Sequence, residues 1–346
     1  IYTQPLTIDA TTIISAKAFK QGLAPSEIQT QSFIFASVNV RNFTSNLPLI
    51  IMDTHGKLVN SEFYISNTGI FIDSNDITNQ TSLTDTPDYA GRCGMRIRGS
   101  SSAGWPKKQY AYETWDEYNQ DKKVSIFGFP TESDWIVHGP WSDKTLMRNY
   151  LAYTWSNKIG QYAPRVKFAE AFLNADGGDL TMDDYVGVYV FMEKIKRDDK
   201  RVDISGLSPT DNSYPDVTGG YILKKDRLDP GDQGFPTSYM GTLAYVEPKE
   251  DEITPEQANY IHSYIADFET ALFGSNFTDP DTGYEKYIDP LAFIDHQIMV
   301  ELTKNIDGYR LSTYMYKDRN SRLKMGPIWD YNLSLGNANY LEGWIP

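Results

Sequence analysis

The sequence predicts an α+β protein in which a small β-sandwich, residues 1–85, precedes a larger mixed domain, residues 86–346. Two observations predict this arrangement. The first 85 residues consist of short, alternating apolar and polar runs separated by turn-forming residues, which is typical of a sandwich. Beyond them, strand-like runs alternate with segments that carry helix start and stop signals, which is typical of a mixed domain.

The expected strands of the first block fall into two groups. The segments "TTIISAKAFKQG" and "SEIQTQSFIFASVNV" alternate around the turn "GLAPSE", and "LPLIIMDTHG" and "EFYISNTGIFID" supply further short strands. This block resembles the small β-sandwich at the C-terminal end of chitobiases. The polar stretch "SNDITNQTSLTDTPDYAG" that follows indicates a linker or a long loop.

In the larger domain, four segments predict strands. "CGMRIRGSSS" and "KKQYAYETW" form two strands joined by a Gly/Ser loop, and "RVKFAEAFLN" and "YVGVYVFMEKI" form an antiparallel pair rich in β-branched and aromatic residues. Two further strands, joined by a charged turn, are expected within residues 305–332.

Three segments predict helices. Residues 142–160 are expected to begin at a cap provided by Ser142 or Asp143, with one apolar face formed by Leu146, Tyr150, Leu151 and Trp155. Residues 254–274 carry the strongest signals: a Thr254–Gln257 capping box, Pro255 in the first turn and Gly274 as a stop. Asp289 and Pro290 repeat this start signal for a third helix.

The overall composition excludes several classes of protein. The formal net charge of −14 argues against a nucleic-acid partner, because phosphate backbones are bound by a surplus of Lys and Arg. No run of 18 apolar residues is present, so no membrane span is expected. The single cysteine, Cys93, excludes an intrachain disulfide and is expected to be buried. The start at Ile1 suggests either a piece cut from a longer chain or a processed mature protein.

The segment "RGSSSAGWPKKQY" is a candidate phosphate-binding loop. It supplies backbone and hydroxyl donors, including those of Ser100, Ser101 and Ser102, and ends in Lys107 and Lys108. Donors and an ammonium group are what phosphate oxygens require. Only one of the two lysines can face inward along a strand. Taken alone, the segment is better explained as an ordinary Gly/Ser turn before a lysine.

Two acids are candidates for pairing with the inward lysine. Asp143 begins the expected helix after the lysine strand, and Glu193 closes the run "YVGVYVFMEKI". Either carboxylate would fix the lysine rotamer. Each also has a simpler explanation, as a helix cap and as a charge at a strand end. Arg148 and Asn149 either support this site or face solvent.

Asp307 and Asp330 lie at the two ends of the expected hairpin. Phosphoryl transfer needs one carboxylate near the acceptor hydroxyl and another on the metal that bridges the phosphates. A hairpin brings its ends together, so the two acids could meet this need, or both could be solvated turn residues. Asp330 lies within "GPIWDYN", an apolar setting in which an unpaired charge would be costly.

With these residues assembled, the chain resembles the spore-coat CotH family of atypical protein kinases. The resemblance lies in an ordered series over residues 90–337: "RGSSS…PKKQY", "DWIVHGPWSDKTLMRNYLAY", "YVGVYVFMEKI", "GGYILKKDR", "NIDGYRLSTYMYKD" and "GPIWDYN". It implies a two-lobed, kinase-like fold.

The resemblance also implies roles for individual residues. Asp307 resembles the catalytic-loop aspartate, Asp330 the metal-binding aspartate, and Lys107 or, with slight preference, Lys108 the lysine that binds the nucleotide phosphates. Glu193 matches the acid after the "Y-x-G-x-Y" strand of the family.

The chain departs from the family pattern at two positions. Ser312 stands where kinases place a metal-binding Asn, and Asn332 stands where the family often has a second acid. Both residues are poorer metal ligands than those they replace.

The expected function is therefore Mg²⁺- or Mn²⁺-dependent transfer of the ATP γ-phosphoryl group to a protein Ser or Thr hydroxyl, by a secreted or cell-surface bacterial protein. The alternative is a non-catalytic, kinase-like protein of an extracellular assembly or polysaccharide surface. A glycoside hydrolase using Asp307 and Asp330 ranks last, because the Gly/Ser–Lys segment has no role in that mechanism.

Overall fold

The computed structural model describes residues 2, 4–74, 79–228 and 232–341. It confirms a mixed α and β composition and divides the chain into two compact units. Unit 1 comprises Ile1–Trp141 and Val166–Lys194, and unit 2 comprises Ser142–Arg165 and Ile195–Pro346. No helix in the described part of the chain is long and apolar enough to cross a membrane.

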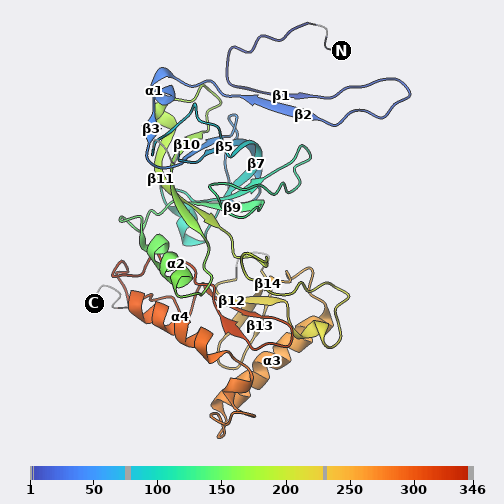
Figure 1. The fold of residues 1–346 in the computed structure, drawn as a ribbon, viewed down its shortest axis with the longest axis vertical. Coiled ribbons are helices and arrows are strands. Elements are labelled where there is room, and N and C mark those ends of the chain that lie inside the picture. The colour runs from blue at the N-terminus through green and yellow to red at the C-terminus, as the bar shows by residue number, and fades with distance from the viewer. Residues whose placement is uncertain (1, 3, 75–78, 229–231, 342–346) are drawn as a thin grey trace. The chain divides into compact units, whose positions relative to one another are not determined.

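Unit 1 is built on a closed barrel of seven strands (Figure 1). The strands follow the order β10, β11, β9, β8, β7, β5, β4 around the barrel. All neighbours are antiparallel except β4 and β10, which close the barrel as a parallel pair. The bounds are β4 (Leu49–Asp53), β5 (Ile65–Ile72), β7 (Tyr89–Ile97), β8 (Tyr110–Thr114), β9 (Asp134–His138), β10 (Val166–Asn174) and β11 (Tyr185–Glu193).

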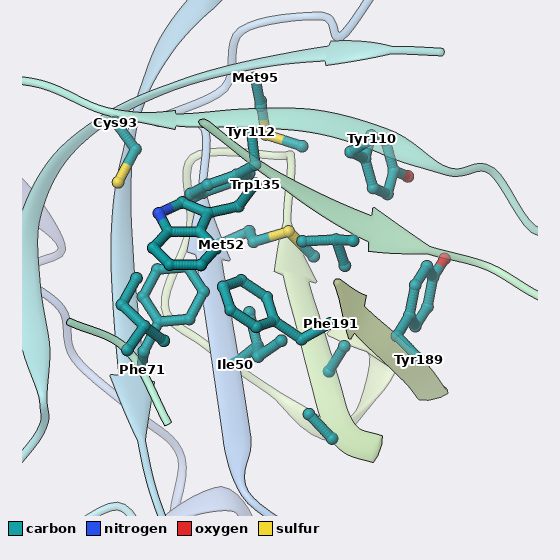
Figure 2. Packing of buried hydrophobic residues seen from close by; sticks show 14 of the residues in the cluster. Ile50, Met52, Phe71, Cys93, Met95, Tyr110, Tyr112, Trp135, Tyr189 and Phe191 are labelled. Atoms are coloured by element: carbon teal, nitrogen blue, oxygen red, sulfur yellow. The ribbon is translucent and has the colours of Figure 1, made fainter. Parts of the chain in front are cut away.

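Aromatic side chains fill the barrel interior (Figure 2). Phe191 lies at the centre, with its ring centroid 5.1 Å from those of Trp135 and Phe127 and 5.5 Å from that of Phe71. Cys93 is fully buried in the same core, as expected, and burial raises the pKa of its thiol to about 12. Close packing of this kind makes each aromatic residue worth about 3–5 kcal/mol against truncation to alanine.

The barrel corrects the prediction of a separate β-sandwich in residues 1–85. Strands β4 and β5 come from this block and pair with β10 and β7, which lie beyond it. The physical reason is visible in β4, whose five residues are all buried. Such a strand needs cover on both faces, and the barrel interior and a second apolar cluster around Val40, Phe172 and Leu180 provide it.

The remaining elements of the first block are small. β1 (Thr12–Ala16) and β2 (Gln29–Phe33) form an antiparallel hairpin, α1 (Val38–Arg41) is a single turn, and β3 (Thr44–Ser45) pairs with β6 (Thr81–Ser82).

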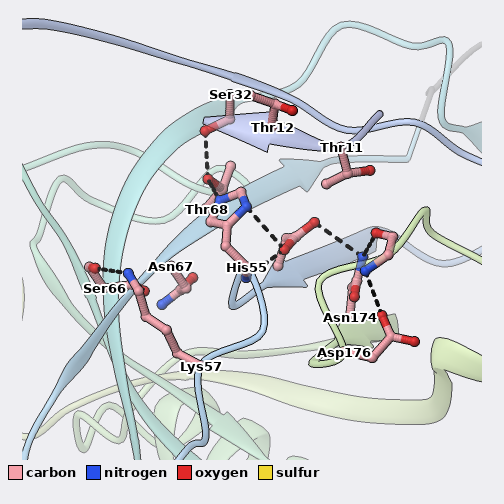
Figure 3. A network of polar contacts seen from close by, with 12 residues as sticks. Thr11, Thr12, Ser32, His55, Lys57, Ser66, Asn67, Thr68, Asn174 and Asp176 are labelled. Atoms are coloured by element: carbon pink, nitrogen blue, oxygen red, sulfur yellow. Dashed lines mark hydrogen bonds and ion pairs between the residues drawn. The ribbon is translucent and has the colours of Figure 1, made fainter. Parts of the chain in front are cut away.

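A chain of polar contacts ties the β1–β2 hairpin to the barrel (Figure 3). The Oγ1 of Thr68 lies 2.6 Å from Ser32 Oγ on β2 and 2.8 Å from His55 Nε2. The backbone N–H of His55 donates to Asp53 Oδ1 at 2.8 Å, and Asn174 Nδ2 donates to Asp53 Oδ2 at 3.2 Å. Because Asp53 and Thr68 are buried, this network anchors the hairpin to the barrel wall.

Unit 2 contains an antiparallel five-stranded sheet with the order β13, β14, β12, β15, β16. Its strands are β13 (Gly234–Pro236), β14 (Thr242–Glu247), β12 (Tyr221–Lys225), β15 (Thr313–Lys317) and β16 (Lys324–Met325), and its helices are α2 (Arg148–Lys158), α3 (Pro255–Phe273) and α4 (Pro290–Thr303). Apolar residues of α3, including Ile261, Ile265 and Phe268, pack on the sheet residues Tyr221, Leu223 and Met315.

The helix start signals of α3 and α4 are confirmed. Thr254 and Gln257 form the expected capping box of α3, and Asp289 accepts the backbone N–H groups of Leu291 and Ala292 at the start of α4. A cap of this kind stabilises a helix by about 1 kcal/mol.

The predictions for α2 were wrong in two details. The helix begins at Arg148 rather than directly after Ser142 or Asp143. Its buried side chains are those of Asn149, Ala152, Tyr153 and Ser156, whereas the expected apolar face is only partly buried.

Candidate functional site

Asp307 lies in the turn between α4 and β15. The backbone N–H groups of Arg310 and Leu311 both donate to the Asp307 carbonyl at 2.9 Å, and the side chain of the buried Asn305 accepts the Asp307 N–H at 3.2 Å. The Asp307 carboxylate accepts a hydrogen bond from Arg310 Nη2 at 2.6 Å. The turn therefore fixes the backbone of Asp307, and its partly exposed carboxylate pairs with the half-exposed guanidinium of Arg310.

Gly308 anchors this turn to α4. Its carbonyl accepts hydrogen bonds from His296 Nε2 and from Thr313 Oγ1, each at 3.0 Å. A Cβ at Gly308 would lie 2.6 Å from Val300 Cγ2, so the close approach of the turn to α4 requires glycine. No local pattern in the sequence marks His296 for this role, which depends on the approach of the turn to α4.

Asp330 has an unusual backbone and an exposed side chain. Its φ is 59°, in the left-handed region, and its N–H donates to the buried hydroxyl of Tyr153 at 3.0 Å. The neighbouring residues Ile328 and Tyr331 are buried, but Asp330 is exposed. The expected apolar setting for its carboxylate is therefore wrong: the left-handed backbone turns this one side chain outward between buried neighbours. Non-glycine residues held in this conformation cluster at functional sites.

Asn332 belongs to a loop that is fastened to the segment before α2. Its Nδ2 donates to Ser142 Oγ at 3.0 Å, and Asn337 Nδ2 donates to the carbonyls of Asn332 and Ser142 at 2.7 and 3.0 Å. The Nε of Arg148 donates to the Ser334 carbonyl at 2.9 Å. Arg148 thus holds the segment that follows Asp330.

Asp143 is the ionic partner of Arg148. The carboxylate accepts hydrogen bonds from the Arg148 guanidinium, from its backbone N–H at 2.9 Å, and from Thr145 Oγ1 at 2.7 Å. Burial opposes ionisation of Asp143, but these hydrogen bonds outweigh it and lower the pKa of the carboxyl. Asp143 therefore stabilises the start of α2 from a position five residues before the helix begins.

Ser312 contacts Asp226, an acid for which the sequence alone predicted no role. Its Oγ donates to Asp226 Oδ2 at 3.3 Å, and its φ of 52° is left-handed. Asp226 follows β12 and Ser312 precedes β15, and these strands pair with Lys225 opposite Thr313. The register of the two strands therefore places a carboxylate beside Ser312. The sequence clue to this contact is the acid at the end of "GGYILKKD". It becomes informative only once the pairing of β12 with β15 is known.

The lysines of the candidate phosphate loop lie in unit 1 and bind backbone carbonyls. Lys107 Nζ donates to the Val186 carbonyl at 3.0 Å and lies 4.4 Å from the centroid of the Tyr189 ring, and burial lowers the pKa of this amine. Lys108 Nζ donates to the Ala103 carbonyl at 2.8 Å. The choice between them as the nucleotide lysine stays a prediction.

The three serines of that loop differ in exposure. Ser100 and Ser101 are exposed, whereas Ser102 is buried and its Oγ accepts a 2.5 Å hydrogen bond from Gln109 Nε2. Gln109 Oε1 in turn lies 2.8 Å from His138 Nδ1. Glu193, the last residue of β11, is buried opposite Trp135.

The donor set suits a metal that arrives with phosphates. Among the described residues, no group of three or more His, Cys, Asp or Glu side chains could hold a metal ion by itself. Mg²⁺ usually binds one or two carboxylates and completes its shell with water and substrate phosphates. The exposed Asp330 carboxylate fits that requirement, and Asn332 and the Ser312–Asp226 pair supply further oxygen atoms in unit 2.

Comparison with known families gives a match over most of the chain. The family model described as CotH kinase protein matches residues 95–345. A search of curated proteins finds no match.

Proposed function

The chain belongs to the CotH kinase family, and from this premise we propose that it transfers the γ-phosphoryl group of ATP to a Ser or Thr hydroxyl of a protein. In this reaction the bond from the γ-phosphorus to the β–γ bridging oxygen breaks, ADP leaves, and a new P–O bond forms to the acceptor oxygen. The acceptor proton passes to the Asp307 carboxylate. We further propose a secreted or cell-surface bacterial protein, with a protein of the same compartment as the acceptor.

The observation that carries this proposal is the contrast between the backbones and side chains of Asp307 and Asp330. Each backbone is held by buried partners, Asn305 for Asp307 and Tyr153 for Asp330, while each carboxylate remains accessible. Catalytic groups need such fixed positions. Acids that merely lie in solvated turns do not require backbones held in fixed positions.

The proposed roles follow from chemistry. Asp307 orients and deprotonates the acceptor, Asp330 with Asn332 holds Mg²⁺ or Mn²⁺, and Lys107 or Lys108 binds phosphate oxygens. When bound, the metal neutralises the charge that develops on the phosphates. The hydroxyls of Ser100, Ser101 and Ser102 and the carboxylates of Glu193 and Asp143 are proposed to shape the nucleotide site. Ser312 is proposed to act together with Asp226.

A thermal-shift titration with Mg-ATP and Mn-ATP tests this proposal. Ligand at 100 times its Kd stabilises a protein by about 2.7 kcal/mol, which raises Tm by several degrees. Asp330→Ala should abolish this rise, and Asp267→Ala, which removes an exposed aspartate of α3, should retain it. Asp307→Asn should lower phosphoryl transfer by orders of magnitude and leave Tm unchanged.

One observation favours a second candidate, a kinase-like binding protein without catalysis at an extracellular assembly or polysaccharide surface. Both candidate lysines donate to backbone carbonyls, whereas a catalytic lysine is usually held by a carboxylate. Absence of any Tm rise with either metal, together with undetectable transfer by the wild type, would favour this candidate.

A further inference from the structure

Helix α4 carries a row of large apolar side chains that is exposed to solvent. Leu291, Ile294, Ile298 and Leu302 are exposed over 71%, 49%, 50% and 65% of their surfaces. Their spacing of three, four and four residues places them on one side of an α-helix. These four side chains are called the α4 stripe below.

The opposite face of α4 already holds the helix in unit 2. Its buried side chains are those of Ala292, His296, Met299, Val300 and Thr303. The α4 stripe therefore does not serve the packing of the helix. Single exposed apolar residues are ordinary in proteins, whereas a contiguous exposed apolar surface commonly marks an interaction site.

Two carboxylates flank the α4 stripe. At about 100° per residue, Asp295 lies on one side of Ile298 and Glu301 on the other. Asp295 accepts a hydrogen bond from Gln161 Nε2 at 2.7 Å, and Glu301 accepts one from the Tyr309 hydroxyl at 2.8 Å. Both donors are neutral, so these contacts leave the negative charges in place. The sequence of α4 contains no Lys or Arg.

The position of Glu301 is unfavourable for the helix itself. It lies in the last turn of α4, which ends at Thr303. The C-terminal end of a helix carries a partial negative charge, so an acid there lowers stability and a cation raises it. A partner's cation beside Glu301 would interact favourably both with the carboxylate and with this end of the helix.

The dimensions of the α4 stripe suit a single helix. From Leu291 to Leu302 it extends about 16 Å along the helix axis, or about three turns. A standard interface between two globular proteins buries about 800 Å² on each side, and one row of four side chains supplies only a fraction of that area. A helix laid along α4 needs no more, because packed helices meet through rows of residues three and four apart.

Charge then selects the partner. A second copy of this chain would bring a further formal charge of −14 to the contact, and the flanking acids repel an anionic lipid surface. We propose that the α4 stripe binds a cationic amphipathic helix of another protein. Its apolar residues cover the stripe, and its Lys or Arg residues pair with Asp295 and Glu301. The proposal does not depend on phosphoryl transfer, and it is tested without ATP.

The test is fluorescence anisotropy with the full chain and a labelled peptide of Leu and Lys that is as long as α4, with leucines spaced three and four residues apart. The peptide should bind with a Kd of about 10 µM or lower, and more weakly as salt is raised. Two control peptides should bind at least tenfold more weakly. One has Glu in place of Lys, and the other has the same Leu and Lys residues in a scrambled order.

Because the stripe is exposed, its residues can be changed without disturbing the core. Ile298→Gln keeps the net charge and should weaken binding of the cationic peptide at least tenfold without lowering Tm. Glu301→Gln should weaken binding severalfold and reduce its dependence on salt. Leu58→Gln, at a leucine of unit 1 that is 85% exposed, is the matched control and should bind as the wild type does.

Four results would overturn the proposal. The cationic peptide could fail to bind, or it could bind Ile298→Gln as tightly as the wild type, which would place it elsewhere. Equal binding of the acidic peptide would remove the charge selection. Finally, sedimentation could show a dimer of the chain alone, or association with phosphatidylcholine vesicles, that Ile298→Gln abolishes. Either outcome would assign the stripe to a second copy or to a lipid surface instead.

Discussion

The imidazole of His296 donates a 3.0 Å hydrogen bond from Nε2 to the carbonyl of Gly308, the residue that follows Asp307. This contact joins the middle of α4 to the turn that carries the proposed catalytic acid. It makes His296 a positioning residue for Asp307, since the histidine acts on the acid through the backbone.

Replacing His296 should therefore change the rate more than the binding of substrate. We expect His296→Phe to lower kcat about tenfold, equivalent to about 1.4 kcal/mol in the barrier, with KM for ATP nearly unchanged. His296→Gln should restore much of kcat because it keeps a donor for Gly308. Steady-state kinetics check this, and equal losses in both variants would contradict a positioning role.

Asp226 is expected to contribute to metal-dependent nucleotide binding through Ser312. Asp226→Asn should reduce the Tm rise given by Mg-ATP more strongly than Ser312→Ala does, because it removes a charge rather than a hydroxyl. Titration of Mg²⁺ at fixed ATP measures the effect. If Asp226→Asn behaves as Asp267→Asn, a matched change at an exposed aspartate, Asp226 has no such role.

Lys317 should make the stability of unit 2 depend on pH in the alkaline range. Its amine is buried against the rings of Tyr260 and Tyr264 and donates to the Thr218 carbonyl, and burial lowers its pKa from 10.5 to about 8. Between these values the unfolded chain binds more protons than the folded chain, so the free energy of unfolding rises with pH.

Urea unfolding at several values from about pH 7.5 to 9.5 should show this rise, by roughly 1–2 kcal/mol. Lys317→Met should remove most of the slope. Lys324→Met, at a lysine whose side chain is 42% exposed, should keep it. A wild-type free energy of unfolding that falls with pH over this interval would contradict the assignment.

The Thr68 hydroxyl is expected to hold the β1–β2 hairpin on the barrel. Thr68→Val keeps the side-chain shape but removes the link between Ser32 and His55, so the amides of β2 should exchange with solvent about tenfold faster. Hydrogen exchange read by mass spectrometry checks this. Thr12→Val, which removes only a local contact to the Ala10 carbonyl, is the control and should leave the rate unchanged.

Local signals in the sequence predicted the local structure well. The Thr254–Gln257 box and Asp289 mark helix starts because capping depends on neighbours in the chain. The β10–β11 pair was predicted for the same reason, as two apolar runs separated by a short turn region. The start of α2 was misplaced because Asp143 acts on the Arg148 N–H from five residues away, outside a normal cap.

Features that depend on distant segments were missed or misjudged. β4 was assigned to a sandwich because its apolar residues do not reveal that β10 is its partner. Asp330 was expected in an apolar setting because its neighbours are apolar, but a positive φ turns its side chain outward. Asp226 and Ser312 are far apart in the chain, and only the register between β12 and β15 brings them together.

The parallel pairing of β4 with β10 has a consequence for biosynthesis. β4 emerges early from the ribosome. Its parallel partner β10 is translated only after Ser142–Arg165, which belong to unit 2. The apolar wall formed by β4, β5, β7, β8 and β9 must therefore wait, with β4 and β9 as unpaired edges, until β10 and β11 have been translated. During that interval the nascent chain exposes unpaired strand edges, which are prone to aggregation. We expect folding of this protein in cells to depend on chaperones at this stage more than on the final stability of the barrel.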